Sequence, residues 1–100
     1  MKFGLSDEVI GKIHSVFLKY PEIEEAVIYG SRAKGNYRLG SDIDLTLKGV
    51  NVTEAVCSAV ITEIDDLNTP YLFDISVFKN LNSPDLEEHI ARVGKSFFTR

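Results

Sequence analysis

Three aspartates lie where their side chains could act together. Asp42 and Asp44 are two residues apart in the alternating segment 42–48. Both should therefore point to the same face of a strand, about 7 Å apart along the backbone. Asp74 lies between two apolar residues in a second strand-like segment, where aspartate is disfavoured. If the two strands are neighbours, all three carboxylates meet on one face. Such oxygen ligands suit Mg²⁺, so the pattern predicts a site for one divalent cation or a pair.

A glycine–serine pair, Gly30-Ser31, follows a short apolar segment and suggests a place for phosphate. Glycine lets backbone N–H groups approach an anion closely, and the serine hydroxyl adds a donor. Segment 30–41 also carries Arg32, Lys34 and Arg38 without any acidic residue. This basic island is either a solvated charge cluster or an anion site, and the adjacent glycine favours the anion site. A nucleoside triphosphate bound together with Mg²⁺ would fit both features.

Other nucleotide- and metal-binding motifs do not fit the same residues. The spacing from Gly30 to Gly35 begins like a P-loop, but Asn36-Tyr37 follows where Lys-Ser/Thr is required. The dinucleotide fingerprint G-x-G-x-x-G is absent. The acid pair also lacks the glycine and the terminal glutamate of an EF-hand loop.

Composition limits what else the chain can be. Its 100 residues are 44% hydrophobic and 26% charged, which is typical of one globular domain over residues 1–100. The net charge of −4 argues against general nucleic-acid binding. Cys57 is the only cysteine, so no intrachain disulfide can form. No apolar run is long enough to span a bilayer, and Asp7 and Glu8 interrupt any signal peptide. We therefore expect a cytoplasmic protein without a membrane contact.

The surrounding pattern predicts an α/β (α+β) domain. Apolar spacing predicts helices over 6–20 and 53–67, and a last helix that begins at Ser83-Pro84 and continues its apolar stripe to Phe97. Segment 31–40 should be a loop with at most one helical turn. Strands are predicted over 25–29, 42–48 and 71–78. We expect a small mixed sheet of three or four strands packed against helices.

The chemistry-bearing residues resemble a known family. The run Gly30-Ser31, ten further residues, and then Asp42-Ile43-Asp44 is similar to the signature of the DNA polymerase β-like nucleotidyltransferases. The fuller string GSRAKGNYRLGSDIDL resembles the minimal nucleotidyltransferases, the small partners of HEPN proteins in prokaryotes. The resemblance covers roughly residues 26–78. It implies a nucleotidyltransferase fold like the polymerase β palm.

The resemblance also implies roles by position. Gly30 and Ser31 would hold the triphosphate of ATP or another nucleoside triphosphate, and Arg32 and Lys34 would assist. The implied catalytic residues are also the implied ligands of two Mg²⁺ ions: Asp42, Asp44 and Asp74.

An activity and a partner follow from the same resemblance. It implies transfer of a nucleotide, AMP from ATP, to a hydroxyl, with a tyrosine of a HEPN-type partner as the expected acceptor. The pair would form a hetero-oligomer in which this chain is the antitoxin. The alternative is a non-catalytic binding module that neutralises a helical partner by complex formation alone. The small size favours that alternative, whereas the intact set of acids favours the enzyme.

Overall fold

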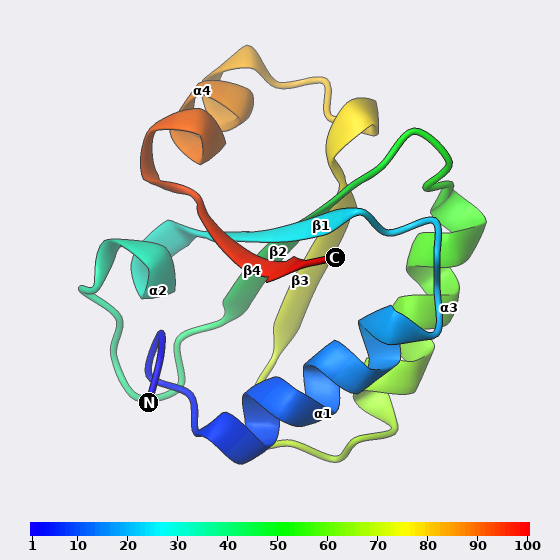
Figure 1. Cartoon of the computed structure of the whole chain (residues 1–100). Coiled ribbons are helices and arrows are strands. Elements are labelled where there is room, and N and C mark those ends of the chain that lie inside the picture. The colour runs from blue at the N-terminus through cyan, green and yellow to red at the C-terminus, as the bar shows by residue number, and fades with distance from the viewer.

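A four-stranded mixed sheet forms the centre of the computed structural model, which describes residues 1–100 (Figure 1). The strand order is β3-β2-β1-β4. β1 runs antiparallel to both of its neighbours, whereas β2 and β3 run parallel. The predicted mixed sheet is therefore confirmed, with four strands. Their bounds are β1 Glu25–Tyr29, β2 Ile43–Lys48, β3 Phe73–Val77 and β4 Lys95–Thr99.

Helices lie on both faces of this sheet. α1 (Asp7–Leu18) and α3 (Glu54–Asp65) pack together on one face, and α4 (Pro84–Val93) packs against β1 on the other (Figure 1). The short α2 (Gly30–Lys34) starts where β1 ends and leads into the loop before β2. A 3₁₀ turn over Phe78–Asn80 follows β3. No helix has the length and apolar character needed to cross a membrane.

Side-chain caps define the starts of the three long helices. Each cap oxygen accepts a hydrogen bond from the backbone N–H three residues later, which satisfies a donor that has no partner inside the helix. The three predicted helices are present. Each begins one residue after its cap, and each ends before the predicted C-terminal bound. The three pairs, each 3.2 Å apart, are Ser6 with Val9, Thr53 with Val56, and Ser83 with Leu86.

Strand alternation divides β2 between the two faces. Ile43, Leu45 and Leu47 are fully buried in the main core against α1 and α3. Successive side chains of a strand point to opposite faces. Asp44 therefore faces the side occupied by α4. Because α4 covers mainly β1, the acid-bearing part of this face is only partly covered.

The C-terminal segment differs from the prediction. Instead of continuing the last helix to Phe97, the chain turns at Gly94 and forms β4 alongside β1. The Gly94 turn brings the backbone so close to α4 that a Cβ would overlap the Ile90 carbonyl. Phe97 and Phe98 then pack against Phe17 of α1. The helical spacing of Phe97 was misleading, because pairing with the free edge of β1 and burial of two aromatic rings outweigh a helix extension.

Candidate active site

The pairing of β2 with β3 places two of the predicted acids side by side. In this parallel register Asp44 is directly opposite Asp74. Neighbouring strands lie about 4.8 Å apart, and residues opposite each other share a face. Asp42 immediately precedes β2 and is two residues from Asp44. The two acid-bearing strands are therefore neighbours, which is the condition for the three acids to share one face.

The three carboxylates are aligned but do not form a closed cluster. Asp44 is half-buried, whereas Asp42 and Asp74 are exposed. The structure has no group of three or more His, Cys, Asp or Glu side chains arranged as a metal-binding cluster. Like charges repel, so the acids gain nothing by converging without a cation. The sheet supplies the strand positions and hard oxygen donors, which fit Mg²⁺ chemically.

The surroundings of Asp44 disfavour its ionised form. Burial is the main cause that raises the pKa of this carboxyl, and the charges of Asp74 and Asp42 raise it further. His89, on α4, acts weakly in the opposite direction. A bound cation would favour the ionised form of Asp44. A raised pKa of this kind is expected for a carboxylate that binds a cation, when the cation is not bound.

Gly30 brings the predicted phosphate residues against the predicted metal ligands. Its φ of +73° is in the left-handed region that favours glycine. A Cβ at this position would overlap Oδ2 of Asp44 and lie 3.4 Å from its Cγ. Ser31 follows in the first turn of α2 and is half-buried. Gly30 is therefore in close contact with Asp44, and Ser31 is adjacent.

Tyr29 is a member of this site that the sequence analysis missed. It ends β1, is buried, and lies opposite Asp44 in the antiparallel register. Burial, followed by the charge of Asp74, raises the pKa of its hydroxyl, while the Ser76 side chain acts in the opposite direction. The strand register thus places Tyr29 beside Asp44. In the sequence Tyr29 is only the last residue of an apolar run, and only the register reveals its neighbours.

Arg32 lies in α2, and its side chain is buried instead of directed at solvent. Its guanidinium donates to the Ser41 carbonyl from Nε at 3.1 Å and from Nη2 at 2.9 Å. Nη1 donates to the Phe3 carbonyl at 2.9 Å. Tyr37 and Tyr71 lie 5.3 and 5.1 Å from the guanidinium carbon. These guanidinium donors hold the loop that leads into the acid pair, and the assistance of Arg32 with phosphate stays a prediction.

Lys34 is better placed to reach an anion. It lies at the end of α2, is exposed and forms no salt bridge. With Arg92 and Lys95 it borders an open hollow of about 390 Å³ between α2 and the turn after α4. The Lys34 side chain is therefore free of an acidic partner, and its contact with phosphate stays a prediction.

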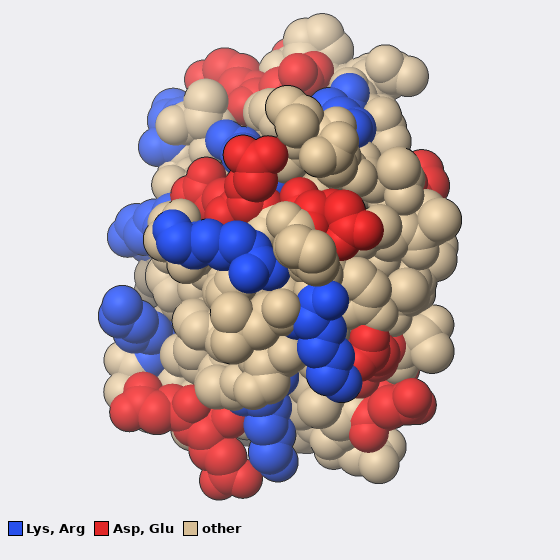
Figure 2. Space-filling view, turned by 45° about the vertical axis from the view of Figure 1, so that its right-hand side comes forward, with Lys and Arg blue, Asp and Glu red and all other residues tan.

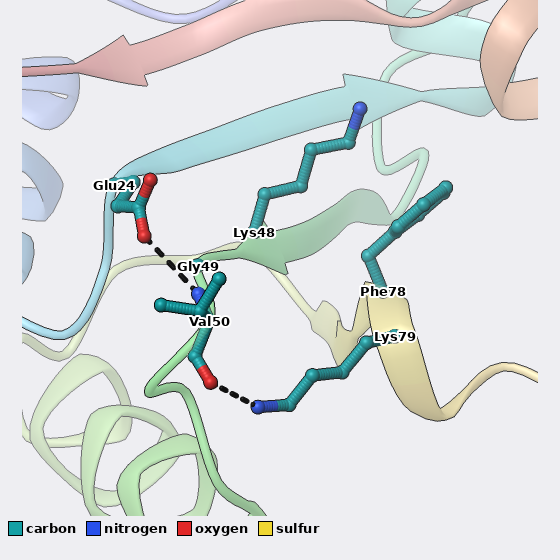
Figure 3. Close-up of a pocket in the computed structure, with 6 residues that line it drawn as sticks. All are labelled: Glu24, Lys48, Gly49, Val50, Phe78 and Lys79. Atoms are coloured by element: carbon teal, nitrogen blue, oxygen red, sulfur yellow. Dashed lines mark hydrogen bonds between the residues drawn. The ribbon is translucent and has the colours of Figure 1, made fainter.

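A separate hollow of about 310 Å³ lies at the opposite end of β2 (Figure 3). Its lining includes Lys48 and Phe78, with the Lys48 ammonium 4.6 Å from the ring centroid. Val50 is held by Glu24, which accepts from its N–H at 3.1 Å, and by Lys79, which donates to its carbonyl at 2.7 Å. About 13 Å of strand separates Lys48 from Asp44. None of the predicted site residues lines this hollow.

Basic and acidic side chains are interspersed on the face seen in Figure 2. No broad, purely basic surface is visible there. An extended basic stripe is the usual electrostatic footprint of general nucleic-acid binding. The basic residues of α2 and the following loop form a small local group in a chain whose net charge is −4.

A mixed sheet with acids on one face, next to a Gly-Ser helix start, agrees with the resemblance to the nucleotidyltransferases. The family model described as "Polymerase beta, Nucleotidyltransferase" matches residues 11–100. The chain belongs to this family. No curated protein sequence is similar enough to the chain to count as a relative.

Solved structures share the fold at low sequence identity. A toxin–antitoxin complex with AMP-PNP has a TM-score of 0.73 at 16% identity, covering 91% of this chain and 73% of that one. The MntA–HepT toxin–antitoxin has a TM-score of 0.69 at 13% identity, covering 95% and 74%. A tri-AMPylated Shewanella oneidensis HEPN toxin in complex with MNT antitoxin has a TM-score of 0.69 at 13% identity, covering 96% and 74%. These similarities establish the polymerase β-like fold.

Proposed function

We propose that this protein is a Mg²⁺-dependent nucleotidyltransferase that moves AMP from ATP to a tyrosine hydroxyl of a HEPN-type partner. The partner would be a toxin, and this chain its antitoxin in the cytoplasm, bound to it in a hetero-oligomer. The observation that carries the proposal is the contact between Gly30 and Asp44, with Asp74 in register beside it. The AMP-PNP and tri-AMPylated toxin complexes of the same fold support the choice of nucleotide and acceptor.

The start of α2, with Gly30 and Ser31, would hold the triphosphate of the nucleotide donor. Gly30 leaves the backbone open to a close approach, and Ser31 adds a hydroxyl donor. Lys34 supplies an exposed positive charge within the same short helix. Arg32 acts through the loop, by holding Ser41 next to Asp42.

The acids would hold the metal and the acceptor proton. Asp42, Asp44 and Asp74 are the oxygen ligands that would bind two Mg²⁺ ions, which when bound neutralise triphosphate charge and favour the acceptor alkoxide. In the transfer, a bond forms between the acceptor oxygen and the α-phosphorus, and the bond to pyrophosphate breaks. Asp74 is exposed on the open edge of the site and would accept the proton of the attacking hydroxyl.

Labelled ATP tests this function directly. The wild-type chain, Mg²⁺ and the HEPN-type protein encoded beside it should give a labelled partner. Asp42→Asn and Asp44→Asn should each reduce labelling at least ~100-fold, because each removes a metal ligand. Asp65→Asn, at the exposed end of α3, is the matched control and should label normally. Full labelling by both site variants would contradict the assignment.

A non-catalytic antitoxin is the second candidate. It is favoured by exposed apolar residues beside the acids, including Leu39 and Leu72, which suit contact with a partner. A variant with Asp42, Asp44 and Asp74 all changed to Asn separates the two functions. Protection of cells by this variant would support neutralisation by binding alone, and loss of protection would support transfer.

A further inference from the structure

Four exposed apolar side chains gather around the loop that leads into the acid pair. Leu39 is 104% exposed, Met1 87%, Leu72 72% and Tyr37 39%. Met1, Tyr37 and Leu39 border one hollow of about 210 Å³, and Tyr71, next to Leu72, lines it too. We call the four exposed residues Met1, Tyr37, Leu39 and Leu72 the loop patch. Single exposed apolar residues are ordinary, but three that border one hollow, with a fourth next in sequence to another lining residue, mark a surface that another molecule covers.

The loop that carries the patch is held from several sides. Beneath it, the buried Arg32 binds the Ser41 carbonyl. Ser41 also accepts a hydrogen bond from the Arg38 N–H at 2.8 Å. Gly4 packs so closely on Tyr37 that a Cβ there would lie 2.7 Å from the ring Cζ. Tyr37 and Leu39 are thus displayed on a well-supported loop, which lowers the entropy cost of binding a partner.

The patch is continuous with the candidate active site. Leu39 precedes Asp42 by three residues, and Leu72 precedes Asp74 by two. The two segments are joined because the Leu72 carbonyl accepts from the Ile43 N–H at 2.9 Å. A protein seated on the patch would therefore lie against the edge of the site where Asp42 and Asp74 are exposed.

Charge indicates the chemistry of the occupant. Arg38 borders the same hollow and is exposed without a salt bridge. The segment 30–41 contains no acidic residue, although the chain as a whole carries −4. An acidic side chain on a partner would find a cation here, beside a hollow large enough for one bulky apolar side chain.

We propose that the loop patch is the docking surface for the acceptor protein. The segment that docks would place one bulky apolar side chain in the hollow and an acidic residue opposite Arg38. Docking there would bring the acceptor hydroxyl to the exposed acids without using the phosphate residues. This inference rests on the proposed function, because it assigns the occupant as the acceptor.

Two substitutions test the surface without touching the catalytic residues. Leu39→Asp places a charge in the apolar contact, and Arg38→Glu reverses the charge that would attract an acid. Each should weaken the affinity for the HEPN-type protein encoded beside this chain at least ~10-fold, measured by calorimetry. The KM for that protein should rise by a similar factor, while Leu39→Asp leaves the affinity for ATP unchanged. Leu18→Asp, at an exposed position of α1, is the matched control.

The outcomes separate this inference from the proposed function. Weakened binding by both variants, with an unaltered control, supports the docking surface even if wild-type chain transfers no AMP. Unchanged affinity in Leu39→Asp and Arg38→Glu would overturn it, even if transfer is observed. Circular dichroism of each variant verifies folding. If Leu39→Asp is misfolded, Leu39→Ser replaces it in the same assay, with the same expected direction.

Discussion

The carboxylate of Asp44 lies directly against the backbone of Gly30, with no room between them for a Cβ. This contact joins the turn that follows β1 to a side chain of β2. It exists because Tyr29, the residue before Gly30, pairs with Asp44 across the antiparallel strands. The contact fixes how the proposed phosphate and metal residues are placed relative to each other.

Gly30→Ala should disturb both the fold and the site. The positive φ disfavours any side chain by about 1–2 kcal/mol, and the new methyl group must displace the Asp44 carboxylate. We expect a lower Tm and a roughly 100-fold loss of transfer, as for a small misplacement of a catalytic group. Affinity for Mn²⁺, followed by electron paramagnetic resonance, should also fall.

Gly35→Ala is the control for backbone strain. Gly35 has a φ of +86°, but a Cβ there would meet nothing within 4 Å. It should lower the Tm similarly and leave Mn²⁺ affinity intact. Equal Mn²⁺ affinities in the two variants would show that the Gly30–Asp44 contact does not matter for metal binding.

Asp44→Asn should stabilise the metal-free fold at neutral pH. Burial and the neighbouring acids raise the pKa of Asp44 in the folded state. Ionised Asp44 therefore opposes folding above that raised pKa, and the penalty disappears as pH falls through it. The Tm advantage of Asp44→Asn, measured in EDTA, should be modest at pH 7 and shrink toward pH 4. A variant less stable than wild type at pH 7 would contradict this expectation.

Arg32→Met should release the loop before the acid pair. It removes three charge-assisted hydrogen bonds to backbone carbonyls, at an expected cost of about 2–4 kcal/mol. Trypsin should then cut faster after Arg38. Arg32→Lys should not rescue the loop, because an ammonium lacks the forked donors. If Arg32 contacted phosphate instead, Arg32→Met would raise the KM for ATP and leave the cleavage rate unchanged.

Phe98→Ala should show how strongly β4 anchors the sheet. Phe98 is buried, and its ring centroid lies 5.3 Å from that of Phe17 and 5.4 Å from that of His14. Loss of this side chain should cost about 3–5 kcal/mol, which corresponds to a Tm decrease of more than ~10 °C. Ser96→Ala, on the same strand but exposed, should change the Tm little. A small effect of Phe98→Ala would mean that β4 contributes little to stability.

Local patterns in the sequence determined most of the elements. Ser6, Thr53 and Ser83 mark helix starts because cap chemistry acts over three residues. The alternation around Asp42 and Asp44 predicted a strand with both acids on one face, since side chains alternate along any strand. The Gly-Ser pair and its spacing to these acids were sufficient to suggest the family that the match over residues 11–100 confirms.

Contacts distant along the chain were decided only by the tertiary structure. The Asp44–Asp74 register, the place of Tyr29 beside the acids and the burial of Arg32 depend on which strands and loops meet. β4 forms because β1 has a free edge with which it can pair, and no local sequence pattern indicates that edge. The sequence indicates the local preference of each residue. Strand pairing and burial depend on two segments that are distant along the chain, so they are decided only when the chain has folded.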